Sequence, residues 1–410
     1  MKILHLSSHD IFGGAAKAAF RIHHAVGERM ESFMGVNSKL SDDYRISYPG
    51  SSSQRFLVKL YTQLNYQPAR FIAKDKNLMF SNGLLGTSFY SRMIDSIRPD
   101  VVNLHWINEG LISVKKIRNI KLPVVWTVHD MWAFTGGCHY TVSCERYKTK
   151  CGKCPQLKSV REYDLSTYIF NIKKQLKGKI TFVAPSRWMK DCIEQSALFA
   201  DSMVHHIPYP VDLNVYKPRP KDVVRDLFGL PKDKKLILFG AMNALQDERK
   251  GFRHLMGALK LLQDDSELVK NTELVVFGSS RPQDELNKMF KTHYLGKFSD
   301  ELAISLAYGA CDAFVAPSTQ DNLPNTVIES LACGVPVVAF NIGGMPDMIT
   351  NGTNGFLAEP FSVEGLAQGI TKALRDTDLL GTNARQKAIE DFTPARIAEQ
   401  YQKVYAGLVH

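Results

Sequence analysis

The chain has 410 residues, which is too long for one ordinary hydrophobic core and predicts two domains of similar size. Its hydrophobic content of 44% and charged content of 22% are those of globular proteins and exclude a disordered chain. The net charge of +10 is unevenly distributed, because residues 1–208 hold 29 Lys and Arg against 16 Asp and Glu. This excess of basic residues predicts either an anionic partner for the first half of the chain or a solvated basic surface.

No segment has the pattern of a membrane span or a secretion signal. The first residues, MKILHLSSHD, lack the apolar centre of a signal peptide, and nowhere do ~18 apolar residues follow one another. We therefore expect a cytoplasmic protein.

Short apolar runs alternate with loops and helical patterns along the first half. The run Lys2–Leu6 precedes Gly13 and Gly14, and apolar residues at helical spacing follow in Ala15–Val26. Further β-branched runs lie at Val101–Leu104, Val124–Val128, Thr181–Ala184 and Val204–Ile207. This alternation predicts a Rossmann-like first domain at residues 1–207, with a parallel sheet covered by helices on both faces.

A proline-rich segment separates this series from a second one. The sequence IPYPVDLNVYKPRP disfavours regular structure and predicts a hinge at residues 208–220. Apolar runs then return at Leu236–Phe239, Leu274–Phe277, Ala313–Ala316, Val335–Ala339 and Phe356–Leu357, with a helical pattern at Phe252–Leu262. We expect a second α/β Rossmann-like domain at residues 221–388 and a C-terminal helix in residues 389–410 that returns to the first domain. Because such sheets bind ligands at the carboxyl ends of their strands, a cleft between the domains is the expected site.

The strongest chemical signal is PSTQDNLPNTVIE at Pro317–Glu329, which continues into SLACGVPVVAFNIGG. Asn325 is a favourable N-cap for a helix that runs to Cys333. The first N–H groups of such a helix bind anions, while Asp321 and Glu329 can bind hydroxyl groups. The segment fits a phosphate together with sugar hydroxyls, although taken alone it more often describes two surface acids beside a capped helix.

This segment resembles the donor-binding signature of family 4 retaining glycosyltransferases (glycosyl transferases group 1), which have the GT-B fold of two Rossmann-like domains facing across a cleft. The shared features are two acids separated by seven residues, a small-residue helix, a Pro-Val-Val strand and Gly-Gly. The resemblance implies that Glu329 binds the nucleotide ribose. It also implies contacts of the donor with Asp321, Asn322, Leu323, Pro324 and Asn325. Asp321 is shorter than the glutamate usual in the family.

Three further segments match the same family in the expected order. Gly13 and Gly14 resemble the loop whose backbone approaches the donor diphosphate, although Gly-Gly alone is more often a turn. His129, in VVWTVHD, resembles the histidine beside the donor sugar, although a histidine at a strand end is more often structural. Lys250 stands where the family keeps a phosphate-binding lysine that neutralises the leaving diphosphate.

The arginine that many family members place just after the preceding strand is absent. Met242 and Asn243 occupy those positions, and Arg249 is the candidate substitute. A solvated loop charge is an equally good description of Arg249.

The resemblance implies transfer of a sugar from a UDP- or GDP-sugar to an acceptor hydroxyl, with retention and without a catalytic metal, in bacterial surface-polysaccharide assembly. The absence of an Asp-x-Asp pair in a strand-end loop agrees with a metal-independent reaction. The alternatives are a nucleotide-sugar epimerase of the same fold and a nucleotide-sugar-binding protein without transfer activity. We expect no nucleic-acid partner, because the basic residues are scattered.

Four cysteines lie close together in an insertion at residues 136–157. They are Cys138, Cys144, Cys151 and Cys154, and the last two form a C-x-x-C pair. In a reducing compartment this set favours a structural zinc ion over disulfides, with metal-free thiols, reduced or oxidised, as the alternative. The other cysteines, Cys192, Cys311 and Cys333, are predicted to lie in the core.

The segment Gln54–Phe80 mixes basic and apolar side chains and predicts docking on an anionic membrane, where the acceptor would be a lipid-linked glycan. Leu57, Leu60, Tyr61 and Leu64 share one helical face, and Arg55, Lys59 and Arg70 lie in the same segment. Pro68 predicts two short helices in place of one. The alternative is that the apolar face packs on the core of its own domain.

Overall fold

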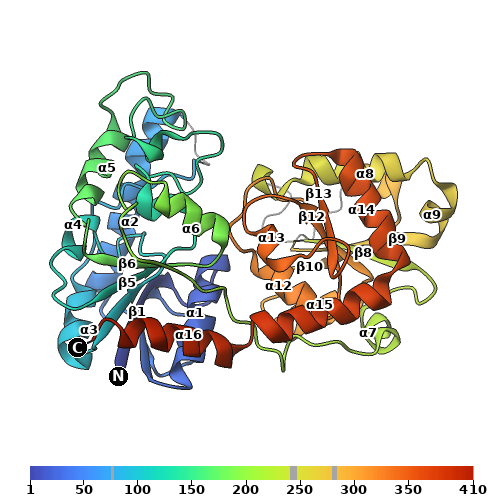
Figure 1. The fold of residues 1–410 in the computed structure, drawn as a ribbon, viewed down its shortest axis with the longest axis horizontal. Helices are drawn as coiled ribbons and strands as arrows, with labels where there is room; N and C mark the ends of the chain where they lie inside the picture. The colour runs from blue at the N-terminus through green and yellow to red at the C-terminus, as the bar shows by residue number, and fades with distance from the viewer. Residues whose placement is uncertain (75–77, 241–246, 279–283, 410) are drawn as a thin grey trace. The chain divides into compact units, whose positions relative to one another are not determined.

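The computed structural model describes residues 1–74, 78–240, 247–278 and 284–409. The chain forms two compact units. Unit 1 comprises Met1–Pro210 and Pro394–His410, and unit 2 comprises Val211–Thr393. Each unit contains one parallel sheet with helices packed against it, so the predicted class of two Rossmann-like α/β domains is confirmed (Figure 1).

The sheet of unit 1 has seven strands in the order β3-β2-β1-β4-β5-β6-β7. Their bounds are β1 Lys2–His9, β2 Glu31–Ser38, β3 Ile46–Ser47, β4 Val101–Leu104, β5 Val124–Thr127, β6 Ile180–Ala184 and β7 Val204–His206. The order reverses between β1 and β4, so loops at their carboxyl ends diverge to opposite faces of the sheet and leave a place for a ligand.

The helices of unit 1 come from both ends of the chain. They are α1 Gly14–Gly27, α2 Ser52–Ala73, α3 Phe89–Ile97, α4 Val114–Ile117, η1 Met131–Phe134, η2 Arg146–Lys148, α5 Leu165–Lys174, α6 Arg187–Glu194 and α16 Pro394–Ala406. The last of these, α16, packs against α1 (Figure 1). Its Tyr401 and Tyr405 hydroxyls are hydrogen-bonded to Thr127 and Asn103 at 3.0 and 2.7 Å, which satisfies buried polar groups of the sheet.

The sheet of unit 2 has six strands in the order β10-β9-β8-β11-β12-β13. Their bounds are β8 Lys235–Gly240, β9 Thr272–Phe277, β10 Thr292–Gly296, β11 Ala313–Ala316, β12 Val337–Phe340 and β13 Gly355–Ala358. The helices are α7 Lys221–Phe228, η3 Glu248–Lys250, α8 Phe252–Leu262, α9 Ser266–Asn271, α10 Asp284–Met289, α11 Glu301–Gly309, α12 Asn325–Ala332, α13 Met345–Met348, α14 Val363–Arg375 and α15 Thr377–Asp391. The strand order reverses between β8 and β11, which marks the ligand position of this sheet.

The proline-rich segment expected as a hinge is shared between the units. Its first residues, up to Pro210, belong to unit 1, and the rest belongs to unit 2, where Tyr216 is fully buried. The chain leaves unit 2 after Thr393, two residues beyond α15. Val211, which begins unit 2, donates a backbone hydrogen bond of 2.9 Å to Phe392, which lies next to its end.

The expectation that Pro68 divides its segment is wrong, because α2 runs without interruption from Ser52 to Ala73. A proline inside a helix deprives the carbonyl four residues earlier of its N–H donor. Here that carbonyl belongs to Leu64, and the side-chain amide of Asn82 donates to it at 3.2 Å. The tertiary hydrogen bond replaces the local one.

Among the described residues, no helix combines the length and the hydrophobicity that a membrane crossing requires.

Candidate functional site

The predicted donor-binding residues of unit 2 gather at the reversal point between β8 and β11. The turn η3, the first element described after β8, carries Arg249 and Lys250, and the loop after β11 leads from Pro317 to α12. The N–H of Thr319 donates to the carbonyl of Arg249 at 2.7 Å and joins the two segments. Residues 70 positions apart in the sequence are thereby brought to one edge of the sheet.

Gly251 permits the close approach of these loops. Its φ of +70° lies in the left-handed region, and a Cβ there would stand 1.8 Å from the carbonyl oxygen of Pro317. No side chain fits at that distance, so only glycine allows the two backbones to touch. The contact fixes the position of the neighbouring Lys250.

Lys250 and Asp321 form an ion pair in which Nζ lies 2.6 Å from Oδ2. The side chains are 23% and 11% exposed, so the pair lies at the surface of the site, within reach of a ligand. Asp321 also accepts from the N–H of Asn322 at 3.0 Å, and the adjoining Gly343 has no room for a Cβ, which would lie 2.0 Å from the Asp321 carbonyl. The structure therefore brings together the predicted phosphate-binding cation and the predicted sugar-binding acid.

Arg249 has a partner within its own turn. Its guanidinium lies 2.7 Å from the carboxylate of Asp247, which also caps η3 by accepting from the Arg249 N–H. This pairing positions the arginine beside Lys250. Met242 and Asn243, which stand where the family arginine is expected, lie outside the described residues.

The helix α12 begins at Asn325, and its N-cap residue is Pro324. The prediction that Asn325 is the N-cap is therefore wrong by one position, because Pro324 already has the extended conformation that ends the loop. No side chain of the described residues caps this end, and its first turn holds no acid. The helix dipole at this end therefore favours an anion. Asn322 and Leu323, in the loop before it, are buried.

Glu329 lies in the second turn of α12 and is only 3% exposed. The hydroxyl of Tyr308 donates to its Oε2 at 3.4 Å. Burial and the charge of Glu329 raise the pKa of Tyr308, so this hydroxyl stays protonated and remains a donor. Sequence analysis did not single out Tyr308, which is an ordinary residue of the apolar helix α11.

In unit 1, Gly13 is the N-cap residue of α1 and Gly14 is its first residue, shortly after the end of β1. Gly13 has a φ of +93°, which favours glycine, while a Cβ built on it meets no other atom within 4 Å. Glycine is therefore favoured at position 13 by its backbone conformation and not by close contacts with other residues. The space around its Cα is open.

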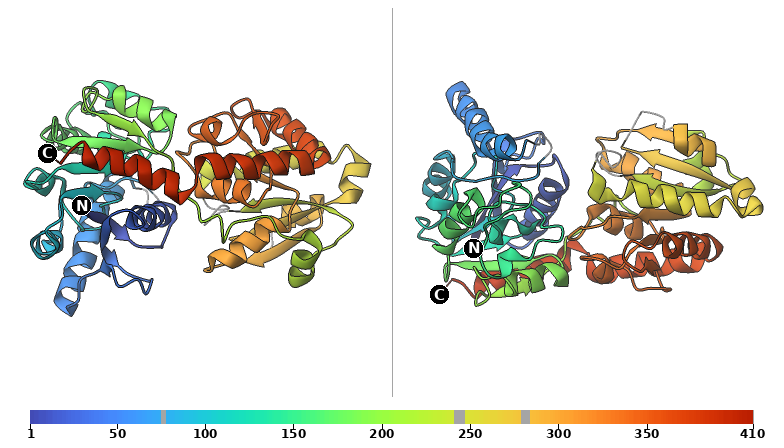
Figure 2. Two further views of the ribbon diagram at one scale, coloured as in Figure 1. Left: turned by 60° about the horizontal axis from the view of Figure 1, so that its bottom comes forward. Right: turned by 90° about the horizontal axis from the view of Figure 1, so that it is seen from above.

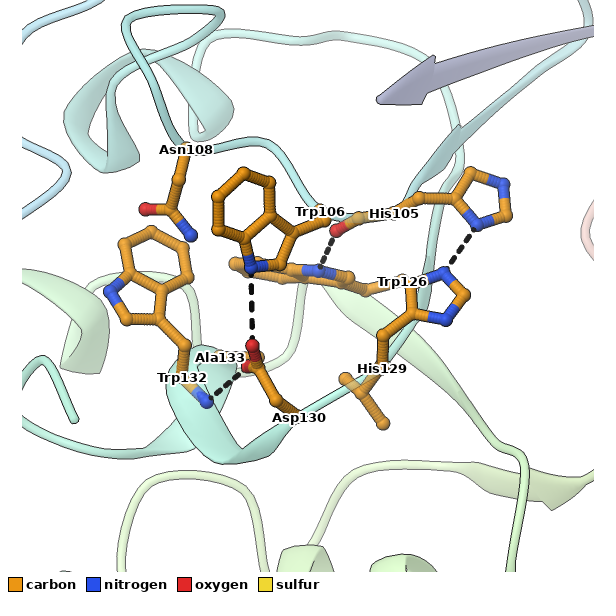
Figure 3. Close-up of a pocket in the computed structure, with 9 residues that line it drawn as sticks. His105, Trp106, Asn108, Trp126, His129, Asp130, Trp132 and Ala133 are labelled. Atoms are coloured by element: carbon orange, nitrogen blue, oxygen red, sulfur yellow. Dashed lines mark hydrogen bonds between the residues drawn. The ribbon is translucent and has the colours of Figure 1, made fainter. Parts of the chain in front are cut away.

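His129 follows β5 closely, as predicted, and is 8% exposed. Its Nε2 lies 3.1 Å from Nδ1 of His105 (Figure 3). Its Nδ1 lies 2.7 Å from the Tyr209 hydroxyl. Burial lowers the pKa of His129 to about 4, so the ring is neutral near pH 7. Both ring nitrogens have protein partners, which orients the imidazole on two sides.

His105 continues into a row of buried histidines that sequence analysis did not identify. Its Nε2 lies 2.9 Å from Nδ1 of His5, and the rings of His5, His105 and His129 stack at centroid distances of 5.2 and 5.3 Å. Burial holds the pKa values of His5 and His105 well below the ordinary value. A neutral imidazole has one N–H, so each ring's tautomer dictates the next.

The hydrogen bonds of this row allow two arrangements of the ring protons, either all on Nδ1 or all on Nε2. The environment of His5, at the end of the row, decides between them. Nε2 of His5 is buried and has no hydrogen-bond partner among the described residues. An unpaired lone pair is tolerated better than an unpaired N–H. We infer that all three rings carry their proton on Nδ1 and that His129 donates to Tyr209.

A second hydrogen-bond network fixes the loop that follows His129. The carboxylate of Asp130 accepts from Trp106 Nε1 at 3.1 Å and from the Trp132 N–H at 2.8 Å (Figure 3). It also lies 2.6 Å from Nδ1 of His139. Nε2 of His139 lies 2.9 Å from Ser81 Oγ, which gives the spacing of a hydrolase triad. Ser81 is fully buried, so this group is structural.

The cysteines fall into two sets. Cys138, Cys144, Cys151 and Cys154 line a common cavity in unit 1. Cys192, Cys311 and Cys333 are buried, which confirms their prediction as core residues.

Comparisons with known proteins agree with this architecture. A family model described as glycosyl transferases group 1 matches residues 233–376, and one described as glycosyltransferase family 4 matches residues 59–215. The chain is 24% identical over its whole length to a protein of Escherichia coli K12 named for colanic acid biosynthesis, the glycosyl transferase WcaC, which is also fully covered.

Two solved structures share the fold. Sucrose-phosphate synthase of Thermosynechococcus elongatus has a TM-score of 0.71 at 17% identity, with 100% of this chain and 99% of that chain covered. HepE of Anabaena, solved with UDP-glucose, has a TM-score of 0.66 at 19% identity, with both chains fully covered.

We predict that Gly251→Ala destabilises unit 2 more than a similar change where space is open. Gly229 is the matched control, because it has a φ of +63° and nothing within 4 Å of a built Cβ. The left-handed conformation alone costs alanine about 1–2 kcal/mol, and Gly251→Ala adds the clash with Pro317. Scanning calorimetry measures both variants, and equal losses would contradict the role given to the loop contact.

We also predict that acid destabilises unit 1 through His129. Between pH 6.5 and 4 the unfolded chain binds more protons than the folded one, so the stability is complete above pH 6.5 and is lost as the pH falls. From pH 7 to 5 this amounts to roughly 2 kcal/mol for His129 alone.

Urea unfolding followed by tryptophan fluorescence measures this effect, because all four tryptophans, Trp106, Trp126, Trp132 and Trp188, lie in unit 1. His129→Gln should reduce the loss between pH 7 and 5, whereas His293→Gln in unit 2 should leave it unchanged. An equal pH dependence in wild type and His129→Gln rules out a neutral His129 as the cause.

Proposed function

Because the chain belongs to the glycosyltransferases of group 1 and family 4, we propose that it transfers a sugar from a nucleotide diphosphate sugar to an acceptor hydroxyl with retention of configuration. The observation that carries this proposal is the grouping of Lys250, Asp321 and the start of α12 at the reversal point of unit 2, with Glu329 one turn further along the helix.

Unit 2 offers complementary groups for each part of a nucleotide diphosphate. The ammonium of Lys250 and the positive end of α12 suit the diphosphate. Glu329, buried and held by Tyr308, suits the two ribose hydroxyls, which donate to a carboxylate. Arg249, beside Lys250, adds positive charge on the same turn.

The ion pair of Lys250 with Asp321 is expected to rearrange when the donor binds. A diphosphate competes with Asp321 for the ammonium, because both are anions. Asp321 then gains acceptor capacity for hydroxyls of the sugar next to the diphosphate. Its short side chain is compatible with this role, because Gly343 lets the backbone of the adjoining loop approach Asp321 closely.

In the proposed reaction, the bond between the anomeric carbon and the diphosphate oxygen breaks while the acceptor hydroxyl attacks the same face of the sugar. Lys250 and the N–H groups of α12 stabilise the charge that develops on the leaving oxygen. The leaving phosphate oxygen takes the acceptor's proton, so the step needs no carboxylate base. Because this positive potential comes from the chain itself, we propose that the reaction does not depend on a metal ion.

His129 fits a role in orientation. Its neutral ring, hydrogen-bonded to His105 and Tyr209, is a poor general base at neutral pH and is fixed in direction. Gly13 leaves open space at the start of α1, which suits the close approach of an anionic ligand.

The relatives suggest the substrate class. One is named for colanic acid biosynthesis and another was solved with UDP-glucose. We therefore propose a UDP-sugar donor, with a GDP-sugar as the alternative, and an acceptor glycan of bacterial surface-polysaccharide assembly.

A coupled assay tests this function. A panel of UDP-, GDP- and ADP-sugars is screened by thermal shift, and consumption of the stabilising donor is measured with and without p-nitrophenyl glycosides as acceptors. We expect acceptor-dependent consumption and, by NMR, retention at the anomeric carbon. Conversion of the donor without acceptor indicates an epimerase, and binding without turnover indicates a binding protein.

Variants locate the reaction in the proposed site. Glu329→Gln should weaken donor binding by roughly 1.5–3 kcal/mol, or roughly 10- to 150-fold, because it removes charge-assisted hydrogen bonds. Glu364→Gln, at an exposed position of α14, is the control. His129→Gln should lower turnover more than binding. Unchanged kinetics in both site variants contradicts the site assignment.

We further propose that helix α2 docks unit 1 on an anionic membrane. Only Asn65, Ala69 and Ala73 of this 22-residue helix are buried. Its large apolar side chains are exposed, with Phe56 at 65% and Phe71 at 85%. Of the predicted apolar face, Leu57, Leu60 and Leu64 are exposed while Tyr61 is half-buried, which favours docking over packing of the whole face on the core. Figure 2 shows α2 standing out from the rest of unit 1.

The exposed residues are arranged for an interface. Phe56, Leu60, Leu64 and Phe71 are spaced by four, four and seven residues, which places them on one face, away from the buried Ala69. Lys59, Arg70 and Lys74 flank this stripe. An apolar face bordered by cations matches a bilayer with anionic headgroups.

Co-sedimentation with phosphatidylcholine vesicles, with and without phosphatidylglycerol, tests this docking. Binding should require the anionic lipid and weaken with salt. Arg55→Glu, Lys59→Glu and Arg70→Glu together should abolish it, since each basic residue contributes about 1 kcal/mol. The same change at Arg118, Lys174 and Lys177, exposed positions elsewhere in unit 1, is the charge-matched control. If the wild-type protein does not bind anionic vesicles at low salt, α2 is not a membrane anchor.

A further inference from the structure

Residues 135–164, between η1 and α5, form a long connecting segment outside the sheet of unit 1. Its only regular element is the single turn η2. Segments of this length without helix or strand are uncommon in compact domains unless they are functional or cross-linked. Yet the segment is packed, with Leu157 and His139 at 1% and 2% exposure. Its apolar residues divide between two clusters, since Tyr147 and Cys151 belong to the main core of unit 1, whereas Cys138, Cys154 and Leu157 belong to a small separate cluster.

Four thiols surround one cavity within this segment. Cys138, Cys151 and Cys154 are buried and Cys144 is half-buried, and all four line the cavity without forming a disulfide. The cavity has room of about 20 Å³, which is sufficient for one water-sized occupant. Thiolates are the preferred ligands of soft and borderline metal ions.

The surrounding charge suits a negative centre. Residues 135–164 contain six basic residues, which are Arg146, Lys148, Lys150, Lys153, Lys158 and Arg161, against three acids, Glu145, Glu162 and Asp164. Glu162 is ion-paired with Arg146, Lys150 and Lys153, so the segment keeps a small excess of positive charge. A divalent ion with four thiolates carries a net charge of −2, which such a basic surface stabilises. Gly152, with a φ of +140°, has no room for a Cβ, which would lie 2.2 Å from the Glu162 carbonyl. The turn therefore has a specific conformation.

We propose that Cys138, Cys144, Cys151 and Cys154 hold one structural zinc ion. Among the described residues, no three of these sulfur atoms lie within 4.8 Å of one another. Zinc at about 2.3 Å from each sulfur brings the sulfurs to about 3.8 Å apart. A change of one χ1 rotamer moves a sulfur by roughly 3 Å, so the thiols can close on the cavity without refolding of the segment.

Among the described residues, one group already has its ligand atoms close enough for a metal ion, namely His23, His24 and Asp43. The guanidinium of Arg45 is paired with this group, since it lies 2.9 Å from the Asp43 carboxylate and 3.3 Å from Nδ1 of His24. A cation paired with the carboxylate disfavours a metal ion at that place.

Zinc at this site would link residues 135–164 structurally to the candidate active site around His129. His139, next to Cys138, is bonded to Asp130, which follows His129 directly. A closed four-thiolate site stabilises folding outright and takes no part in catalysis. The ion would therefore stiffen the loop that carries His129.

Metal analysis of the full chain tests the proposal. The protein is purified without a histidine tag from medium without added zinc, and its metals are measured by mass spectrometry. We expect about one zinc per chain. Cys151→Ser and Cys154→Ser should lose the zinc and lower the melting temperature, while Cys192→Ser and Cys311→Ser, which change buried thiols outside the cavity, should retain it.

The wild-type metal content decides the question if the variants fail to fold. Cobalt-grown protein should show the absorption bands of tetrahedral sulfur coordination. Metal well below one per chain with unchanged stability of Cys151→Ser overturns the site, and so does thiol titration that reveals a disulfide among the four. Iron in place of zinc overturns the choice of metal.

Discussion

The contact between Gly251 and the carbonyl of Pro317 is the constraint on which the candidate donor site depends. Parallel strands bring the loops after β8 and β11 to the same edge of the sheet, but they leave the distance between the loops open. The missing side chain of Gly251 lets the backbones meet, and the bond from Thr319 to Arg249 holds them together. Lys250 then reaches Asp321, although the two residues are 71 positions apart in the sequence. Charge recognition in this unit is thus a consequence of backbone geometry.

Unit 1 places its functional groups by a different means. Its sheet buries three histidines in adjacent positions, and burial keeps them neutral at a cost in hydration. Hydrogen bonds between the rings recover part of this cost, and they leave His129 with one orientation and one tautomer. In the role that we propose for His129, such fixed polarity is an advantage, because no reorganisation is needed during the reaction.

The fold was largely predictable because the central strands are continuous apolar runs. Val101–Leu104 and Ala313–Ala316 were located to the residue, since both are buried on each face. The strand β2 was missed because ESFMGVNS mixes polar with apolar residues, and β10 because THYLG is only half-buried. Near Pro68 and Asn325, tertiary contacts or a neighbouring proline outweighed the local preference.

The candidate site was predictable only in part. Asp321, Glu329 and Lys250 stood out because their segments match a family pattern, and the structure brings Lys250 to Asp321. The histidine row did not stand out, because His5 and His105 become neighbours of His129 only through the strand order β1-β4-β5. A sequence does not reveal that order. The partners of Glu329 and His129, Tyr308 and Tyr209, come from distant segments for the same reason.

The return of α16 to unit 1 makes unit 2 an insertion within unit 1, with its two ends joined by the bond from Val211 to Phe392. During synthesis the chain emerges from its N-terminus, so every residue of unit 2 is available before α16 exists. Until then Asn103 and Thr127 lack the tyrosine hydroxyls that satisfy them, and the surface that α16 covers is exposed. Unit 1, which is synthesised first, is therefore the last unit to be completed. A ribosome that stops shortly before the end would release a chain with a complete unit 2 and an incomplete unit 1.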